Sequence, residues 1–153
     1  MGAELFKNIY LFKDLSSQEL EALSAISSVE TFNPGDEIFS EGDQAVSLFV
    51  IKFGTVRIRR TGKDNTIDVA QLGTGAHFGE MAFVDGEPRS ATVEAMERSE
   101  IVRIDFDKLR TLFENTPAMA VKVYRALAHF LCGRLRVTTM DLSFSREKNI
   151  RHF

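Results

Sequence analysis

The chain has 153 residues, of which 44% are apolar and 27% charged, so it has the size and composition of one ordinary globular domain. No apolar run is long enough to cross a membrane and no signal-peptide pattern opens the chain, so we expect a cytoplasmic protein without a membrane span. The formal net charge of −3 argues against a nucleic-acid-binding domain, and the single cysteine, Cys132, excludes an internal disulfide and a cysteine-cluster metal site.

The first part of the chain predicts short helices. Residues Leu5 to Phe12 are apolar and aromatic, and the segment that follows carries a helix-start signature. Ser16 and Glu19 have the spacing of a capping box, and Leu15 and Leu20 are placed to close a hydrophobic staple around it. We interpret these helices as packing elements and assign no chemistry to them.

From Val29 onward the pattern changes to short strands separated by turn residues. One apolar run is ended by Gly54, and the next segment alternates apolar with basic side chains, which is typical of a strand with one buried face. The strand candidates are residues 47–53, 55–60, 67–72, 91–95 and 101–104. Many short strands with glycine turns between them predict an antiparallel sandwich or barrel.

Two helices are predicted after the strands. Asp105 is placed as the N-cap of a helix over Phe106 to Glu114, and Asn115-Thr116-Pro117 separates it from a last helix that runs from Ala118 to about Leu142. The last helix carries two apolar stripes, which are Val121, Tyr124, Ala128, Leu131, Leu135, Thr138 and Leu142, and Val123, Leu127, Phe130 and Val137. The pattern leaves two arrangements open. Either one stripe meets a partner helix, or both form one broad core-facing surface.

The stretch from Phe78 to Ala95 is the most distinctive chemically. Gly79 allows a ligand to approach the backbone closely, and Glu80 supplies a carboxylate, which only accepts hydrogen bonds and therefore suits sugar hydroxyls. The residues after the glycine read as one helical turn, whose free N–H groups favour an anion. Pro88 restricts the backbone that leads to Arg89, and the planar, charged guanidinium of Arg89 matches the geometry of a phosphate. Together these groups indicate a nucleotide ligand.

This stretch closely resembles the phosphate-binding cassette of the cyclic nucleotide-binding domain family. The family pattern is FGE, then Met or Leu, Ala, a variable loop, and then Arg, a small residue and ATV, and every part of it is present. The resemblance implies that Glu80 binds the ribose 2′-hydroxyl and that Arg89 binds the cyclic phosphate. It further implies a set of ligand-binding residues that consists of Phe78, Gly79, Glu80, Met81, Ala82, Arg89, Ser90 and Ala91.

The resemblance extends over about residues 5 to 115. The PGD, EGD and F-x-I-x-x-G-x-V-x-I signatures of the family have counterparts at 34–36, 41–43 and 49–58. It implies a mainly β fold, a double-stranded antiparallel and jelly-roll-like β-roll with N-terminal helices and a C-terminal helix pair. Residues 1–114 would form the roll with its N-terminal helices, and residues 115–153 would form a helical lid, relay segment and tail of the same domain.

The resemblance also indicates which residues cover the ligand and which nucleotide to expect. Its C-terminal helix caps the base and relays binding, so Phe130 and Arg134 are the candidate lid residues, by stacking or by hydrogen bonding. A threonine directly after the cassette arginine favours guanine in the family, whereas alanine is usual for adenine. Ser90 occupies this position and is also common in cAMP-binding relatives, so we expect cAMP, with cGMP as the alternative.

Nothing in the chain predicts catalysis. The histidines His77, His129 and His152 are scattered, and the cassette has no general base or metal to activate water. We therefore expect no catalytic residues, no metal ligands and no cofactor. His77 is expected to be structural or solvated, and Cys132 to be a buried small hydrophobe.

The leading hypothesis is a regulatory sensor module that signals through movement of its C-terminal helix, either free-standing or part of a larger protein. A second hypothesis is an interaction module of the same fold that works with or without ligand, as a homodimer or with an effector protein bound through that helix. A third, a metal-dependent enzyme of the cupin type, is disfavoured because such sites need several histidines on neighbouring strands.

Overall fold

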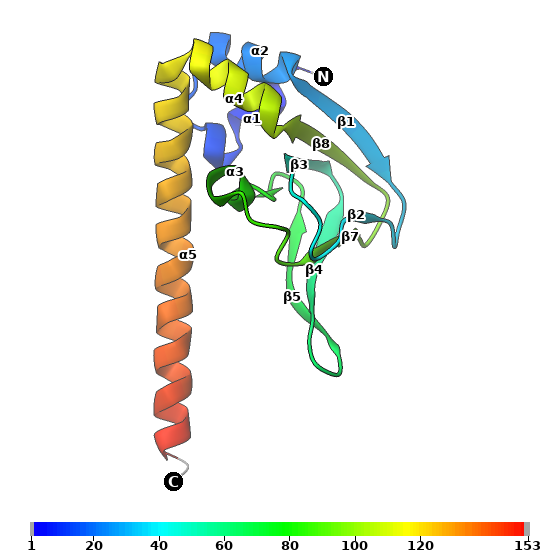
Figure 1. The fold of residues 1–153 in the computed structure, drawn as a ribbon, viewed down its shortest axis with the longest axis vertical. Coiled ribbons are helices and arrows are strands. Elements are labelled where there is room, and N and C mark those ends of the chain that lie inside the picture. Colours follow the sequence, from blue (N-terminus) through cyan, green and yellow to red (C-terminus); the bar gives the residue numbers. More distant parts are fainter. Residues whose placement is uncertain (1, 152–153) are drawn as a thin grey trace.

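The computed structural model describes the backbone of residues 2–151 and the side chains of residues 2–142, so His152 lies outside the described residues. Within the described part of the chain, eight strands form two antiparallel four-stranded sheets (Figure 1). The first sheet has the order β1-β8-β3-β6 and the second β2-β7-β4-β5. The strands are β1 (Ser27–Phe32), β2 (Glu37–Phe39), β3 (Ser47–Phe53), β4 (Thr55–Thr61), β5 (Thr66–Gly73), β6 (His77–Phe78), β7 (Thr92–Ala95) and β8 (Ser99–Asp105). The predicted β-roll with flanking helices is confirmed.

The helices flank this roll. They are α1 (Glu4–Lys7), the 3-10 helix η1 (Tyr10–Phe12), α2 (Ser17–Ala25), α3 (Met81–Asp85), α4 (Phe106–Asn115) and α5 (Pro117–Arg151). Figure 1 shows α1, α2 and α4 gathered at one end of the roll, while α5 runs along its side as one long rod. The last helix is therefore longer than the predicted span, which ended near Leu142.

The start of α2 has the predicted cap. The Ser16 hydroxyl accepts a hydrogen bond from the Glu19 backbone N–H at 3.2 Å, and the Ser16 N–H donates to the Glu19 carboxylate at 2.8 Å. Leu15 and Leu20, on either side of this box, are both buried. The capping box is confirmed, and it satisfies two backbone donors that would otherwise lack partners at the helix start.

Strand β3 separates two apolar cores. Leu48 and Val50 belong to the core that the helices share with the first sheet, whereas Phe49 and Ile51 belong to the core between the two sheets. Because successive side chains of a strand point to opposite faces, a continuous apolar run is what a strand buried on both sides requires.

Helix α5 packs through residues of both predicted stripes near its start. Val123 and Leu127 of one stripe are buried, and Tyr124 of the other stacks on Phe83 of α3. Farther along, Leu135 and Val137, one from each stripe, are 66% and 59% exposed. Packing is thus set by the position along the helix and not by the stripe, and a partner helix for the exposed residues stays a prediction.

Two local predictions differ from the structure. Asp105 occupies the N-cap position of α4, but its carboxylate accepts a hydrogen bond from Arg103 Nε at 2.9 Å instead of capping the helix. The prediction that Cys132 is buried is wrong, because its side chain is exposed. It lies on the solvent-facing side of α5, between residues 130 and 134 that line the cavity on the other side, and its neighbour Leu135 is itself 66% exposed.

An ion pair joins the cap of α2 to α5, and we expect it to contribute to stability at neutral pH. Lys122 Nζ donates to Glu19 Oε1 at 2.7 Å, and this contact, with the Ser16 N–H, holds the pKa of Glu19 below its usual value. A carboxyl with a lowered folded-state pKa stabilises the fold at neutral pH and loses that contribution as pH falls through the lowered pKa. Lys122→Met should lower the free energy of unfolding by about 0.5–1 kcal/mol at pH 7.

Urea denaturation at several pH values measures this difference, which should shrink toward acid pH. Lys108→Met is the matched control, because Lys108 Nζ is exposed and 3.9 Å from Asp105. An equal loss in both variants, or a difference independent of pH, would contradict the assignment.

Gly54, in the turn between β3 and β4, should not tolerate a side chain. Its φ is +119°, and an added Cβ would overlap the Ser99 hydroxyl and lie 2.8 Å from Ser99 Cα. Gly42 has a φ of +90° with no atom within 4 Å of such a Cβ. We expect Gly42→Ala to lose about 1–2 kcal/mol from backbone strain, and Gly54→Ala to lose about 1–3 kcal/mol more from overpacking. Equal melting temperatures for the two variants would refute the overlap.

Candidate functional site

A cavity of about 620 Å³ lies between the roll and α5. It is lined by residues from the second sheet, from β6 and α3, from the loop that follows α3, and from one face of α5. All ten residues predicted from the sequence line it, which are Phe78, Gly79, Glu80, Met81, Ala82, Arg89, Ser90, Ala91, Phe130 and Arg134. The structure thus brings the cassette and the two lid candidates to one space.

The cassette turns sharply between β6 and α3. Gly79 has a φ of +79°, a conformation that favours glycine, and an added Cβ would lie 2.9 Å from an Arg89 guanidinium nitrogen. Glu80 follows at the N-cap position of α3, and this helix ends at Gly86 in a left-handed C-cap. This single helical turn agrees with the turn predicted after Gly79.

Arg89 is buried and holds the cassette against the first sheet. Its Nη1 donates a hydrogen bond to the Gly79 carbonyl at 2.9 Å, and its Nη2 donates to the Ser47 carbonyl at 2.5 Å. The guanidinium carbon lies 4.0 Å from the ring centroid of Phe39, a cation–π contact. The remaining donor, Nε, is buried and has no hydrogen-bond partner among the described residues.

The environment of Arg89 lowers the pKa of its guanidinium to about 10. Burial is the largest cause, and the positive charge of Arg103 adds to it, while Asp43 and Glu80 act in the opposite direction. With a pKa near 10 the side chain is still cationic at neutral pH. The wall of the cavity therefore contains a buried positive charge, one of whose N–H donors, Nε, has no partner among the described residues.

Glu80 places a buried negative charge in the same cavity. Its side chain is almost fully enclosed, and burial, the largest influence, would raise the pKa of the carboxyl. His77 and, more weakly, the charge of Arg134 oppose this effect, and the resulting pKa of Glu80 is below its usual value. Glu80 is therefore an ionised acceptor at neutral pH, which matches the predicted role toward hydroxyl groups.

The structure also places His77 next to the predicted site. The prediction left open whether this side chain is structural or solvated, and it is buried, with Nδ1 3.3 Å from Glu80 Oε1. The angle at this contact is not that of a good hydrogen bond, so Nδ1 is left without a well-aligned partner among the described residues. The polar contact with His77 is nevertheless the largest of the influences that lower the pKa of Glu80.

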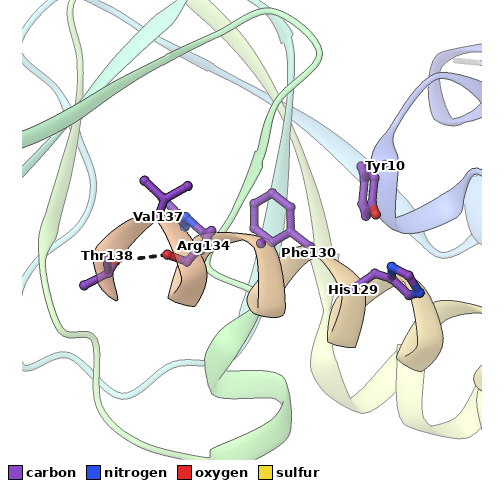
Figure 2. Close-up of a pocket in the computed structure, with 7 residues that line it drawn as sticks. Tyr10, His129, Phe130, Arg134, Val137 and Thr138 are labelled. Carbon is purple, nitrogen blue, oxygen red and sulfur yellow. Dashed lines mark hydrogen bonds between the residues drawn. The ribbon is translucent and has the colours of Figure 1, made fainter. Parts of the chain in front are cut away.

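Helix α5 closes the side of the cavity. The Phe130 ring centroid lies 4.6 Å from that of His77 and 5.8 Å from that of Tyr10, and the Arg134 guanidinium lies 5.3 Å from the Phe130 centroid. Figure 2 shows that Phe130 and Arg134 also line a second, more open cavity of about 570 Å³, with Tyr10 and His129 at its other end. Thr138 donates a hydrogen bond to the Arg134 carbonyl one turn earlier, at 3.0 Å (Figure 2).

Several lining residues were missed by the sequence reasoning. They come from strands distant in sequence and from the end of the lid, and they are Phe39, Ile58, Arg60, Val69, Ala70, Leu72, His77 and Thr138. Ile58 carries a signal, since the alternation in β4 places it on the same face as Val56. Phe39 carries none, because its strand has only three residues, too few for a periodic pattern.

No cluster of three or more His, Cys, Asp or Glu side chains among the described residues is suited to hold a metal ion. No helix in the described part of the chain is long and apolar enough to span a membrane.

Known proteins share both the sequence pattern and the fold. The model of the cyclic nucleotide-binding domain matches residues 29–116. The chain is 34% identical to a cAMP-dependent protein kinase regulatory subunit of Debaryomyces hansenii, over 63% of this chain and 21% of that protein. It is 31% identical to the cyclic AMP receptor protein of Thermus thermophilus, over 91% of this chain and 64% of that protein.

A solved cyclic nucleotide-binding domain from Methylobacillus flagellatus superposes with a TM-score of 0.78 at 27% identity, over 88% of this chain and 80% of that one. The chain thus spans about a fifth of the kinase subunit and less than two thirds of the receptor protein. Because the family model matches more than half of the chain and the β-roll agrees with it, the chain belongs to the cyclic nucleotide-binding domain family.

Proposed function

We propose that this regulatory domain binds cAMP in the cavity between the roll and α5, and that α5 transmits the occupancy of that cavity. The observation that carries the proposal is the burial of two opposite charges, Glu80 and Arg89, in one cavity that α5 also lines. In this proposal Glu80 accepts a hydrogen bond from the ribose 2′-hydroxyl, and Arg89 pairs with the cyclic phosphate.

The buried charges suit a ligand that carries both a hydroxyl group and an anion. An ionised carboxylate with few water contacts interacts strongly with a hydroxyl donor, because its environment screens the charge less than water does. Arg89 offers a buried Nε donor without a partner, and an anionic oxygen is a suitable acceptor for it. The backbone amides around Gly79, Met81, Ala82 and Ser90 complete the phosphate cradle.

The remaining walls suit a flat heterocyclic base. Ile58 and Leu72 provide apolar surface, and Phe130 and Arg134 approach from α5 as the lid. A base can stack on the ring of Phe130 or on the plane of the guanidinium, or accept a hydrogen bond from it. We favour adenine over guanine for two reasons. Position 90 holds a serine, whereas the family uses a threonine at this position for guanine, and the two relatives described above are named for cAMP.

We propose that the nucleotide is a signal and not a substrate. Hydrolysis of a cyclic phosphate needs an activated water, and the described residues include no cluster that holds a metal to activate one. The domain would then need no cofactor, and its output would be a change in the population of α5 positions.

Contacts between α3 and α5 supply a route for that output. Phe83 of α3 stacks on Tyr124 of α5 with a centroid distance of 5.9 Å and an interplanar angle of 16°. Phe83 also contacts Phe106 and Phe113 of α4. A ligand that shifts the cassette would move Phe83 and so favour a different packing of α5. In this view the segment from residue 115 is the lid and relay of the same domain.

Calorimetric titration of the nucleotide-stripped protein with cAMP and cGMP tests the proposal. We expect one-to-one binding with the tighter affinity for cAMP. Arg89→Ala should weaken cAMP binding about tenfold or more, because a charge-assisted pair contributes about 1.5–3 kcal/mol.

Arg110→Ala is the matched control, since it removes the same charge from an exposed residue outside the cavity that pairs with Asp107. Both variants are checked by thermal melting, because Arg89 also anchors the cassette. Unchanged cAMP affinity in a folded Arg89→Ala variant would refute the phosphate assignment, and tighter binding of cGMP would refute the base preference.

One observation favours a second function, interaction through the exposed face of α5. Beyond the roll this helix carries large apolar side chains that are more than half exposed, namely Leu135, Val137, Met140 and Leu142. Such a surface fits a second copy of the chain or an effector helix. This function would accompany ligand binding or replace it.

Sedimentation velocity with and without cAMP tests this second function. If α5 mediates self-association under ligand control, the sedimentation coefficient should change on adding cAMP, and Leu135→Glu should abolish the larger species. Ile67→Glu serves as a control for surface charge, because Ile67 is similarly exposed but lies on β5 and does not line the cavity. A monomer under all conditions would exclude self-association and leave an effector protein as the partner of this face.

A further inference from the structure

We infer that His77 is a positioning residue that prepares Glu80 for the ribose and connects the ribose site to the lid helix α5. The inference rests on the proposed ligand site and deepens it. It concerns a residue that makes no predicted contact with the ligand but contacts two residues that do.

The backbone fixes the place of His77. It lies on the two-residue strand β6, where it pairs with Val50 of β3, and Phe78 beside it is stacked on Phe49. The imidazole is only 6% exposed. Because both neighbours are held by the sheet and its core, the ring has little freedom to turn away from Glu80.

The geometry indicates that the ring nitrogen Nδ1 of His77 carries a hydrogen. Nδ1 lies 3.3 Å from Glu80 Oε1, is buried, and has no hydrogen-bond partner among the described residues. An ionised carboxylate only accepts hydrogen bonds, so the nitrogen that faces it must carry a hydrogen to avoid repulsion between lone pairs. This holds for the neutral ring and for the imidazolium. His77 therefore presents an N–H to the carboxylate that is proposed to bind the ribose.

The other side of the ring contacts the lid. The Phe130 centroid lies 4.6 Å from that of His77, and Arg134 lies over Phe130. The titratable and charged groups around this cluster are Glu80 and Arg89 from the cassette, Arg134 and His129 from α5, and Tyr10 from η1. The adjacent β3 residues, Phe49 and Val50, have none. A lid that moves away would uncover the ring and weaken its effect on Glu80.

The consequence concerns the charge state of Glu80. Burial alone would raise the pKa of this carboxyl, and His77 is the first of the influences that lower it. Without His77 the carboxyl would be protonated over a wider pH range, and a neutral carboxyl is a weaker acceptor for a hydroxyl group. If His77 only filled space beneath α5, its removal would not change how strongly Glu80 binds the 2′-hydroxyl.

The test compares the affinities of cAMP and 2′-deoxy-cAMP, because their ratio isolates the 2′-hydroxyl. For the unaltered protein we expect a ratio of about ten or more, the size of a hydrogen bond to a charged group. In His77→Leu the ratio should fall to about three or less. His77→Asn should restore most of it, because the Asn amide can present an N–H near the position of Nδ1.

The pH dependence of the same ratio provides a second readout, since the ratio cancels titration of the base. In the unaltered protein the ratio should persist until the pH falls through the lowered pKa of Glu80. In His77→Leu the loss should begin at a higher pH, because the largest of the influences that oppose the burial of Glu80 is gone and only weaker ones, such as the charge of Arg134, remain. His129→Gln, which replaces an exposed histidine, should leave the profile in place.

The outcomes separate this inference from the proposed function. If the unaltered protein binds neither nucleotide, or binds both equally, the ribose assignment of Glu80 fails and the inference fails with it. If it discriminates and a folded His77→Leu discriminates equally well, with the same pH profile, then His77 has only a packing role and the inference alone is overturned.

A measurement on the unaltered protein covers the case in which His77→Leu does not fold. With ¹⁵N-labelled histidine, the His77 Nδ1 resonance should shift on binding cAMP and shift much less on binding 2′-deoxy-cAMP. Because the chain has three histidines, His129→Gln and His152→Gln together identify the His77 resonances, each by removing one set. Equal shifts with the two ligands would overturn the inference.

Discussion

The site depends on a single buried guanidinium. Arg89 donates hydrogen bonds to two backbone carbonyls, that of Gly79 in the cassette and that of Ser47 at the start of β3, and it lies against the Phe39 ring of the second sheet. One cation thus connects the cassette to both sheets of the roll. Burying a charge has a large desolvation cost, which these carbonyls and the aromatic ring only partly offset. An arrangement of this kind is suited to receive an anion that completes the compensation.

The opposite charge lies on the other side of the cassette turn and faces the lid. Glu80, His77 and Phe130 form a chain of contacts from α3 through β6 to α5. Each contact is between buried or half-buried groups, so small changes in the position of α5 alter the solvation of the carboxylate. The proposed acceptor for the sugar and the position of the helix are in this way physically linked, which is what the proposed regulatory function requires.

Helix α5 serves two surfaces with one amphipathic pattern. Near its start, Val123 and Leu127 fill the core beneath the N-terminal helices, and the Lys122–Glu19 pair links the same region to the α2 cap. Farther along, from Leu135 to Leu142, its large apolar residues are more than half exposed. The packed half holds the helix to the domain, and in the proposed function the exposed half would carry its movement to a partner.

The sequence by itself determined the short antiparallel strands, the α2 capping box and the cassette turn, and its resemblance to a known family implied the β-roll and the residues proposed to bind a nucleotide. The strands, the cap and the turn are local features, since each depends on glycine and proline conformations, on capping spacings or on two-residue alternation within a short segment. Only the tertiary structure decided which residues of α5 pack, that Cys132 is exposed, and that His77, Phe39 and Leu72 line the same cavity as Glu80. Those facts depend on where elements distant in the chain meet, and a helix pattern does not reveal where along its length the roll ends. The charge states of Glu80 and Arg89 belong to the second group, because burial and neighbours from other strands and helices set them.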